Sequence, residues 1–350
     1  MLYSPLGKSG VNVSRVCLGS MTWGLQNTLA DADEQIAYAL ANGVNFIDTA
    51  EMYAVPPSAD TYGKTEAIIG DWLSRNKNKR NDVVIATKIA GNGLPWVREG
   101  GDITRQSVIN AVEDSLARLK TDVIDLYQLH WPNRPTPHFG RHFPGTIRFS
   151  DANTDQHTAS MLDILEGLND CVTAGKIKHC GLSDDTPWGI SQFLRLSDEH
   201  NLPRMVSIQN EFSLIHGKDW PYLIEQCIHE EIAYLPWSPL AGGMLSGKYQ
   251  NGARPEGSRW TISQRNGLFR NTQASEQAIN QYMAIASQLG ITSAQLALAW
   301  CNQVDGVAST IIGATSMAQL KENIDAFNIQ LSEQTLNDIA HVYQQFPAPF

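Results

Sequence analysis

The fold is indicated by NFIDTAEMY (45–53), VVIATK (83–88) and VIDLYQLH (123–130). Each of these apolar stretches is strand-like and ends on polar residues. Outward from them, short apolar runs alternate along the chain with stretches of helical periodicity. The predicted strands cover residues 15–18, 44–48, 83–88, 123–129, 177–182, 205–209, 232–237 and 308–312. The predicted helices cover residues 31–42, 64–77, 104–119, 158–174, 186–200, 219–229, 274–289, 293–303, 316–327 and 331–345. Strands nearly all followed by helices favour an α/β fold, a closed (β/α)8 TIM barrel.

Further elements are predicted at the two ends of the chain. Residues 2–13, with Gly7 and Gly10 as turn signals, predict an N-terminal β-hairpin, and the last helices are extra C-terminal ones. A doubly wound open sheet is the competing fold, but LGSMTWG (18–24) does not match the G-x-G-x-x-G nucleotide fingerprint. Thr104 and Ser293 are the expected first caps of their helices. Without a linker or low-complexity stretch, we expect one domain over residues 1–350.

Composition narrows the classes of partner. The net charge of −10 argues against nucleic acid and anionic membranes, which both favour basic surfaces. The five cysteines are scattered and form no C-x-x-C pair, which is typical of reduced thiols. The N-terminus has no apolar signal core, and no apolar run reaches the length of a membrane span. We therefore expect a cytoplasmic protein that is not bound to a membrane.

Four polar side chains, Asp48, Tyr53, Lys88 and His130, stand at or just past the ends of the three quoted strands. Carboxyl ends of parallel strands gather at one face of a barrel, so these groups should converge there. A lysine beside a tyrosine stabilises phenolate and lowers the phenol's pKa from about 10. An aspartate holds the lysine charged, and a neutral histidine can donate a hydrogen bond to a carbonyl oxygen. The set suits reduction of a carbonyl by hydride from a cofactor.

Two predicted connections are longer than barrel turns require. Residues 131–157 contain aromatics and prolines suited to a substrate wall. Residues 238–271 contain glycines and cations that suggest contact with phosphate. The tryptophans Trp23, Trp96 and Trp131 are expected to line the substrate pocket. No anchor for an acidic substrate stands out, and Arg134, Arg141 and Arg148 are candidates that no pattern supports.

The chain resembles the aldo-keto reductase superfamily from end to end, and within it the bacterial Tas-type branch. The segments that carry the resemblance are FIDTAEMYAVPPSADTYGKTEAIIG (46–70), IATK (85–88), DLYQLHWP (125–132), IKHCGLSD (177–184), IQNEF (208–212), WSPLAGGMLSGKY (237–249) and STIIGATSMAQLKEN (309–323). The resemblance implies a barrel that binds NADPH without a Rossmann motif and reduces a small-molecule carbonyl. It also implies that Asp48, Tyr53, Lys88 and His130 form the catalytic tetrad.

The resemblance further implies a set of cofactor-binding residues. Ser183, Asp184 and Gln209 match the positions that hold the nicotinamide carboxamide, and Trp237 matches the aromatic that stacks on the ring. Asp184 replaces the family's Asn, and its charge would favour NADP⁺ over NADPH. The remaining implied positions are Gly19, Met21, Ser238, Pro239, Leu240, Gly242, Gly247, Lys248, Arg254, Gly313, Thr315, Ser316, Gln319, Glu322 and Asn323.

Gly313 and Gln319 stand where many members carry Lys and Arg. The loss of a bidentate arginine weakens phosphate recognition. Lys248, Arg254, Thr315 and Ser316 can still supply donors, so NADPH is the first expectation, and use of NADH stays open.

Each polar residue also has an ordinary explanation. Asp48 and Lys88 could form a structural ion pair, Tyr53 could be a packed aromatic, and His130 could be a core histidine. Their joint pattern favours reductase chemistry, and Lys88 beside Asp48 argues against a metal site. One alternative is a nucleotide-sensing regulatory subunit with little turnover, resembling potassium-channel β subunits. Another is a barrel hydrolase or isomerase that uses Asp48 and His130. The sequence leaves the physiological substrate and the oligomeric state open.

Overall fold

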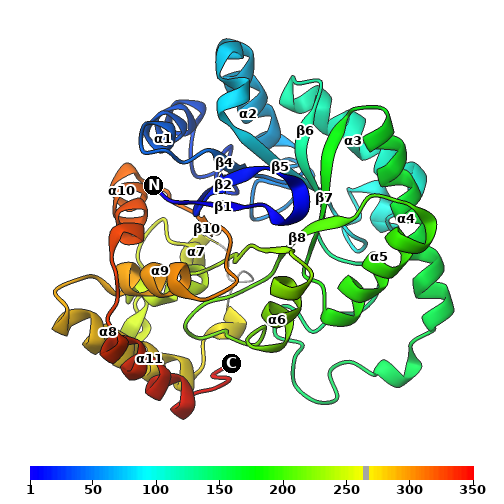
Figure 1. Cartoon of the computed structure of the whole chain (residues 1–350). Helices are drawn as coiled ribbons and strands as arrows, with labels where there is room; N and C mark the ends of the chain where they lie inside the picture. The colour runs from blue at the N-terminus through cyan, green and yellow to red at the C-terminus, as the bar shows by residue number, and fades with distance from the viewer. Residues whose placement is uncertain (263–267) are drawn as a thin grey trace.

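Parallel strands form a barrel in the computed structural model, which describes residues 1–262 and 268–350 (Figure 1). The strands are β3 (Val16–Gly19), β4 (Phe46–Asp48), β5 (Val84–Ile89), β6 (Ile124–Leu129), β7 (Ile177–Ser183), β8 (Met205–Gln209), β9 (Ala233–Tyr234) and β10 (Thr310–Ile312). They pair in the order β10-β3-β4-β5-β6-β7-β8-β9, all parallel. The predicted (β/α)8 barrel is confirmed.

The segments around β9 and β10 close the sheet on itself. Tyr234 forms a parallel bridge with Val307, and its carbonyl oxygen accepts a 2.9 Å hydrogen bond from the Ala308 amide. The Pro236 carbonyl accepts from the Ile311 amide at 2.9 Å. β9 is shorter than the predicted 232–237 strand, and Pro236, which has no N–H to donate, follows it closely.

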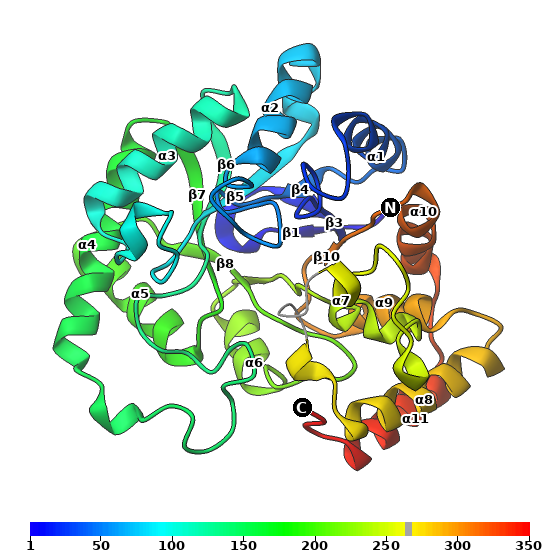
Figure 2. The ribbon, with the colours of Figure 1, turned by 180° about the vertical axis from the view of Figure 1, so that it is seen from behind.

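The predicted N-terminal hairpin is present and closes one end of the barrel. It consists of β1 (Tyr3–Pro5) and β2 (Asn12–Ser14), which pair antiparallel. Leu6 and Val13 are fully buried, in one apolar cluster with Phe46 and Val206 from the amino-terminal parts of barrel strands. Gly7 has φ +54°, and a Cβ there would lie 2.3 Å from the Val206 carbonyl oxygen. The hairpin therefore covers the amino-terminal end, and the opposite end carries the long loops (Figure 2).

Helices surround the barrel. They are α1 (Leu29–Ala41), α2 (Lys64–Arg75), α3 (Arg105–Leu119), α4 (Thr154–Thr173), α5 (Pro187–His200), α6 (Tyr222–His229), α7 (Arg259–Ile262), α8 (Gln273–Gln288), α9 (Ser293–Gln303), α10 (Met317–Asp325) and α11 (Glu333–Gln345). The short α7 was not predicted and lies inside the long 238–271 connection. None of these helices is long and apolar enough to span a membrane, within the residues that the structure describes.

Helix caps follow the predicted chemistry with one correction. The Thr104 hydroxyl accepts from the Ser107 amide at the start of α3, as expected. Ser293 was wrongly assigned as the cap of α9, because it is already the first helical residue. Thr292 has extended backbone and forms the capping box instead: its hydroxyl accepts from the Gln295 amide at 3.1 Å, and the Gln295 side chain accepts from the Thr292 amide.

The C-terminal helices add a second apolar cluster beside the barrel. α8 and α11 lie side by side in both views (Figures 1 and 2) and contribute Tyr282, Ile339 and Val342 to it. The chain then turns back, and Phe350 is 5% exposed, with its ring against Phe269 at 5.8 Å between centroids. All five cysteines are free and buried, in agreement with the predicted reduced thiols.

Candidate active site

Three neighbouring strands place the four polar groups at the carboxyl end of the barrel. Asp48 is the last residue of β4, Lys88 lies near the end of β5, and His130 follows β6 directly. Tyr53 lies in the turn after β4, and its ring centroid is 5.3 Å from the Lys88 Nζ. The rings of Tyr53 and His130 meet edge to face, with 5.6 Å between their centroids. The predicted convergence is therefore present.

The Lys88 ammonium is fully buried, and oxygens accept from it on several sides. Asp48 accepts with Oδ1 at 2.8 Å and Oδ2 at 2.6 Å, and the Thr49 carbonyl accepts at 2.8 Å. Burial by itself lowers the pKa of Lys88, but the charge of Asp48 and the neighbouring Tyr53 outweigh it, and the net pKa is raised. Lys88 is consequently a cation at neutral pH.

Tyr53 differs from the sequence-based expectation. Burial raises its pKa above the ordinary value, and the positive charge of Lys88 opposes that rise without cancelling it. The expected net lowering of the phenol's pKa is therefore wrong: Lys88 does lower it, but the desolvation of a phenolate outweighs the attraction of one ammonium. Tyr53 thus holds its proton and is available as a donor.

His130 is neutral, as predicted. Burial, and then the charge of Lys88, lower its pKa well below the ordinary value. Its Nδ1 is buried and has no hydrogen-bond partner among the described residues. A neutral imidazole carries one N–H donor and adds no charge to the site.

A cavity of about 800 Å³ opens at this end of the barrel. Asp48, Tyr53 and His130 line it, while Lys88 stands behind them. Most positions implied for the cofactor also line it: Gly19, Met21, Ser183, Asp184, Gln209, Trp237, Ser238, Pro239, Leu240, Gly242, Lys248, Gly313, Thr315, Gln319, Glu322 and Asn323. One continuous hollow therefore joins Asp48, Tyr53 and His130 to residues from distant parts of the sequence.

Three implied positions do not line the cavity. Gly247 has φ +77° and ends a 3₁₀ segment, where an added Cβ would meet the Met283 side chain at 2.9 Å. Arg254 is exposed, and its guanidinium lies over the Trp260 ring, 4.9 Å from the centroid. Ser316 caps α10 by accepting from the Gln319 amide. The structure thus gives Gly247, Arg254 and Ser316 structural contacts outside the cavity.

Two other arginines, which the sequence reasoning missed, line the cavity. Arg270 is buried and pairs with Glu211 at 2.5 Å. Arg259 is half-buried, donates to the Met21 sulfur at 3.4 Å, and forms no salt bridge with a described residue. Burial, and then the charge of Arg270, lower the pKa of Arg259. The only signal in the sequence was the general excess of cations in 238–271, which did not single out these two.

Asp184 is buried and has φ +50°, a left-handed conformation that Asp and Asn tolerate better than most residues. Its Oδ1 accepts from the Trp237 Nε1 at 3.1 Å and lies 3.5 Å from the His138 Nδ1. Burial raises the pKa of Asp184 well above the ordinary value, despite the Trp237 hydrogen bond. The expected preference for NADP⁺ over NADPH requires a charged Asp184 and therefore applies only above that raised pKa.

The cavity has features that fit a nicotinamide nucleotide. Gly242 and Gly243 have φ of +68° and +96°, a conformation that favours glycine. A Cβ on Gly243 would lie 2.8 Å from the Lys248 side chain. The backbone here therefore carries no side chain and lies beside a cation, as in many phosphate sites. Ser183 and Gln209 are paired in register on β7 and β8. The Gln209 amide donates to Asp48 at 2.8 Å, which leaves its oxygen without a described partner.

The predicted substrate wall is only partly correct. Trp131 lines the cavity, with Met52, Val55 and Phe139 beside it. Trp23 is a fully buried core residue whose Nε1 donates to Gln35, and Trp96 lines a different hollow. Of the three arginines, Arg134 pairs with the buried Asp185, and neither Arg141 nor Arg148 lines the cavity.

Known proteins resemble this chain over nearly its whole length. The model of the aldo/keto reductase family matches residues 15–344. Protein Tas of Escherichia coli is 41% identical over all of both chains. A probable voltage-gated potassium channel subunit beta of Arabidopsis thaliana is 30% identical over 99% of this chain and 98% of its own. The uncharacterized oxidoreductase YrpG of Bacillus subtilis is 28% identical over 100% of this chain and 97% of its own.

The match to this family supports an oxidoreductase activity on carbonyl compounds with a nicotinamide cofactor. This activity agrees with the chemistry of the four grouped side chains. From the match over residues 15–344 and the full-length identity to protein Tas, the chain belongs to the aldo/keto reductase family.

Proposed function

We propose that this protein reduces an aldehyde or ketone with NADPH, reversibly, and that Tyr53 supplies the proton. The observation that carries the proposal is the position of the Lys88 ammonium, bonded to Asp48 on one side and 5.3 Å from the Tyr53 ring centroid on the other. A permanent cation beside a neutral phenol stabilises the phenolate that forms when the proton leaves.

The chain's own groups have separate roles in this reaction. Tyr53 donates its proton to the carbonyl oxygen as negative charge develops there. Lys88 stabilises the phenolate, and Asp48 keeps Lys88 charged and in place. His130 is neutral, so its N–H can orient and polarise the carbonyl without competing as an acid. The bound nucleotide supplies the hydride.

Residues around the cavity would hold that nucleotide. Ser183, Asp184 and Gln209 would hold the carboxamide, and Trp237 offers an aromatic face for the ring. The bare backbone at Gly242 and Gly243, with Lys248 and Arg259, suits the pyrophosphate. Thr315, which precedes α10, and Gln319 and Asn323, within it, would take the 2′-phosphate end. Because Gly313 and Gln319 add no cation there, NADPH should be preferred over NADH only moderately.

The decisive experiment compares the natural protein with Tyr53→Phe on a panel of aldehydes and ketones, following reduced-nicotinamide absorbance with NADPH and with NADH. We expect Tyr53→Phe to lose at least about a hundredfold in turnover, the usual scale of a general acid. Its affinity for NADPH, measured by quenching of tryptophan fluorescence, should stay within about twofold, since the substitution removes one hydroxyl that only the carbonyl uses.

Full turnover in Tyr53→Phe would overturn the proposed role. The regulatory-subunit alternative takes its support from the 30% identity to the Arabidopsis protein described as a potassium channel subunit beta. Tight NADPH binding by the natural protein, with negligible rates across the whole panel, would favour that alternative over the reductase.

A further inference from the structure

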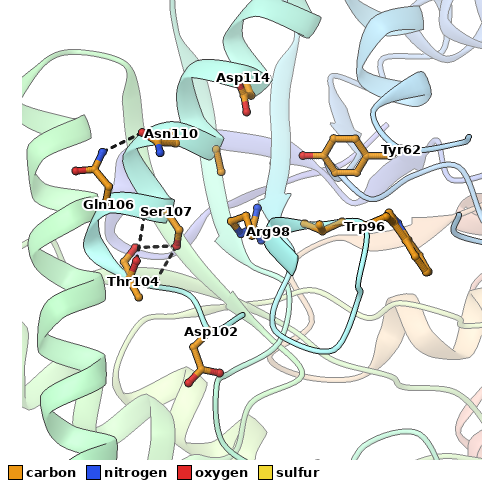
Figure 3. A pocket seen from close by; sticks show the side chains of 11 residues that line it. Tyr62, Trp96, Arg98, Asp102, Thr104, Gln106, Ser107, Asn110 and Asp114 are labelled. Carbon is orange, nitrogen blue, oxygen red and sulfur yellow. Dashed lines mark hydrogen bonds between the residues drawn. The ribbon is translucent and has the colours of Figure 1, made fainter. Parts of the chain in front are cut away.

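Glu51 is a buried carboxylate to which the proposed reaction gives no role. It lies in the turn between β4 and Tyr53, its side chain is 0% exposed, and it does not line the large cavity. Two of its partners are Tyr62, before α2, and Arg98, in the loop after β5, which line a separate hollow of about 470 Å³ beside α3 (Figure 3). The carboxylate is thus bound from the flank of the barrel, on residues that do not line the large cavity.

Three donors hold the Glu51 carboxylate. Its Oε1 accepts from the Ala90 amide at 2.6 Å and from the Arg98 Nη1 at 2.8 Å, and its Oε2 accepts from the Tyr62 hydroxyl at 3.0 Å. Burial raises the pKa of Glu51, and the charge of Arg98 and the Ala90 hydrogen bond oppose that rise. Burying a carboxylate costs free energy unless donors surround it, and hydrogen bonds to a charged acceptor are the stronger ones. The position of this side chain is therefore closely defined.

Glu51 joins the turn that carries Tyr53 to β5 at two points. Its amide donates to the Lys88 carbonyl at 3.1 Å, and its carboxylate accepts from the Ala90 amide, two residues further along. Tyr53 lies two residues after Glu51, and its amide donates to the Ala50 carbonyl at 3.1 Å within the same turn. Tyr53 and Lys88 thus lie on the two sides of this connection. Their separation, 5.3 Å from the ring centroid to Nζ, depends on it.

A second buried carboxylate nearby lacks this connection. Glu66 on α2 is also 0% exposed, pairs with Arg118 at 2.6 Å and accepts from the Thr87 hydroxyl at 2.6 Å. Its carboxylate forms no hydrogen bond with the turn that carries Tyr53, among the residues that the structure describes. The two glutamates are therefore alike in burial and in pairing with an arginine, and they differ in the segment that they hold.

We propose that Glu51 is a positioning residue: by holding the turn against β5, it sets the separation of the Tyr53 phenol from the Lys88 ammonium, and with it the rate of proton donation. The inference rests on the proposed function and adds a residue that touches neither the cofactor nor the carbonyl. The essential atom is the oxygen that faces the Ala90 amide, because that hydrogen bond joins the turn to the strand. A displacement on the order of 1 Å can slow a positioned reaction about a hundredfold.

The test compares two variants that both remove the charge of Glu51. Glu51→Gln keeps an oxygen for the Ala90 and Arg98 donors, and the Tyr62 hydroxyl can accept from the new amide. Glu51→Met has a similar length and no such oxygen. Reduction of an aldehyde is followed in a single turnover of the full chain with NADPH bound beforehand. Fluorescence titration gives the dissociation constant of NADPH, and urea unfolding gives the stability of each variant.

The two variants should separate position from charge. Glu51→Met should slow the single turnover about tenfold to a hundredfold and leave the NADPH dissociation constant within about twofold. Glu51→Gln should stay within about threefold of the natural rate. Its stability should still fall, because Arg98 loses its counter-ion. The matched control Glu66→Met should lose stability and keep the rate. In an Arg98→Met background, where no unpaired cation opposes folding, the two Glu51 variants should show the same ratio of rates.

Equal rates in Glu51→Met and Glu51→Gln would overturn the proposal, because the oxygen that faces Ala90 would then be irrelevant. A Glu66→Met rate as low as that of Glu51→Met would also overturn it, because a general loss of stability would explain both. A natural rate in Glu51→Met, with turnover lost in Tyr53→Phe, would remove the role of Glu51 and leave the proposed function standing. A natural protein without turnover on any carbonyl would overturn the proposed function, and this role with it.

Discussion

Three of the four catalytic candidates and part of the 238–271 loop line the same cavity, yet the two regions are held in different ways. Asp48 and Lys88 lie on strands whose positions are set by ladder pairing, and each is locked by several hydrogen bonds. Arg254 and Arg259 lie in a long connection, where only tertiary packing decides which side chain faces inward. The position of a side chain at a strand end thus follows from the register of the strands. The position of a side chain in a long loop depends on tertiary packing, which a sequence pattern does not reveal.

The largest expected effect comes from breaking the strand-end pair. Lys88→Met leaves the Asp48 carboxylate buried without its cation, and we expect the free energy of unfolding to fall by about 3–5 kcal/mol. Turnover should fall to background at the same time. Urea titration monitored by tryptophan fluorescence measures the first effect, and carbonyl-dependent oxidation of NADPH measures the second.

Two further variants test whether burial of the ion pair causes this loss of stability. Lys8→Met removes a cation from the exposed pair with Glu231 and should cost less than about 1 kcal/mol. The double variant Asp48→Asn with Lys88→Met removes both buried charges and should regain much of the stability lost in Lys88→Met. Equal stability losses in Lys88→Met and Lys8→Met would show that the strand-end pair is not specially stabilised by burial.

The second prediction separates the two loop arginines. Arg259→Ala should raise the dissociation constant of NADPH about tenfold or more, because a hydrogen bond from a charged group contributes roughly 1.5–3 kcal/mol. Arg254→Ala, whose side chain lies over Trp260 outside the cavity, should change it less than about twofold. Fluorescence titration at two salt concentrations measures both, and the natural protein should show the steeper salt dependence. Equal effects of the two substitutions would contradict the structural assignment.

The smallest effect is expected at Asp184, and it depends on pH. Its pKa in the folded protein is raised, so the folded state binds more protons than the unfolded state above about pH 4, and stability falls as pH rises from there through the raised pKa. Asp184→Asn abolishes this titration. The melting temperature of the variant relative to the natural protein should therefore increase between pH 4 and pH 8, as measured by thermal unfolding.

The same substitution tests the cofactor. Above the raised pKa of Asp184, the charged carboxylate should favour NADP⁺ over NADPH, and the ratio of their dissociation constants should change with pH in the natural protein only. If the ratio in Asp184→Asn equals the ratio in the natural protein at every pH, Asp184 has no role in this preference.

The contrast between strand and loop also explains how much the sequence could predict. Asp48, Lys88 and His130 were predictable because an apolar run followed by a polar residue defines a strand end, and parallel strands bring such ends together. Trp23 was misassigned because the sequence does not distinguish a tryptophan in the core from one that lines a pocket. Arg259 was missed because nothing local distinguishes it from Arg254. The net pKa of Tyr53 depends on total burial, a property of the folded molecule.

The bonding of Lys88 has a chemical consequence for the proposed reduction of aldehydes and ketones. A free amine next to an aldehyde condenses with it to an imine, which would poison the site. The three N–H donors of Lys88 are directed at Asp48 and Thr49, and its nitrogen is 0% exposed and protonated. It therefore offers no lone pair for attack, and Tyr53 and His130, rather than the amine, border the space that an incoming aldehyde can reach.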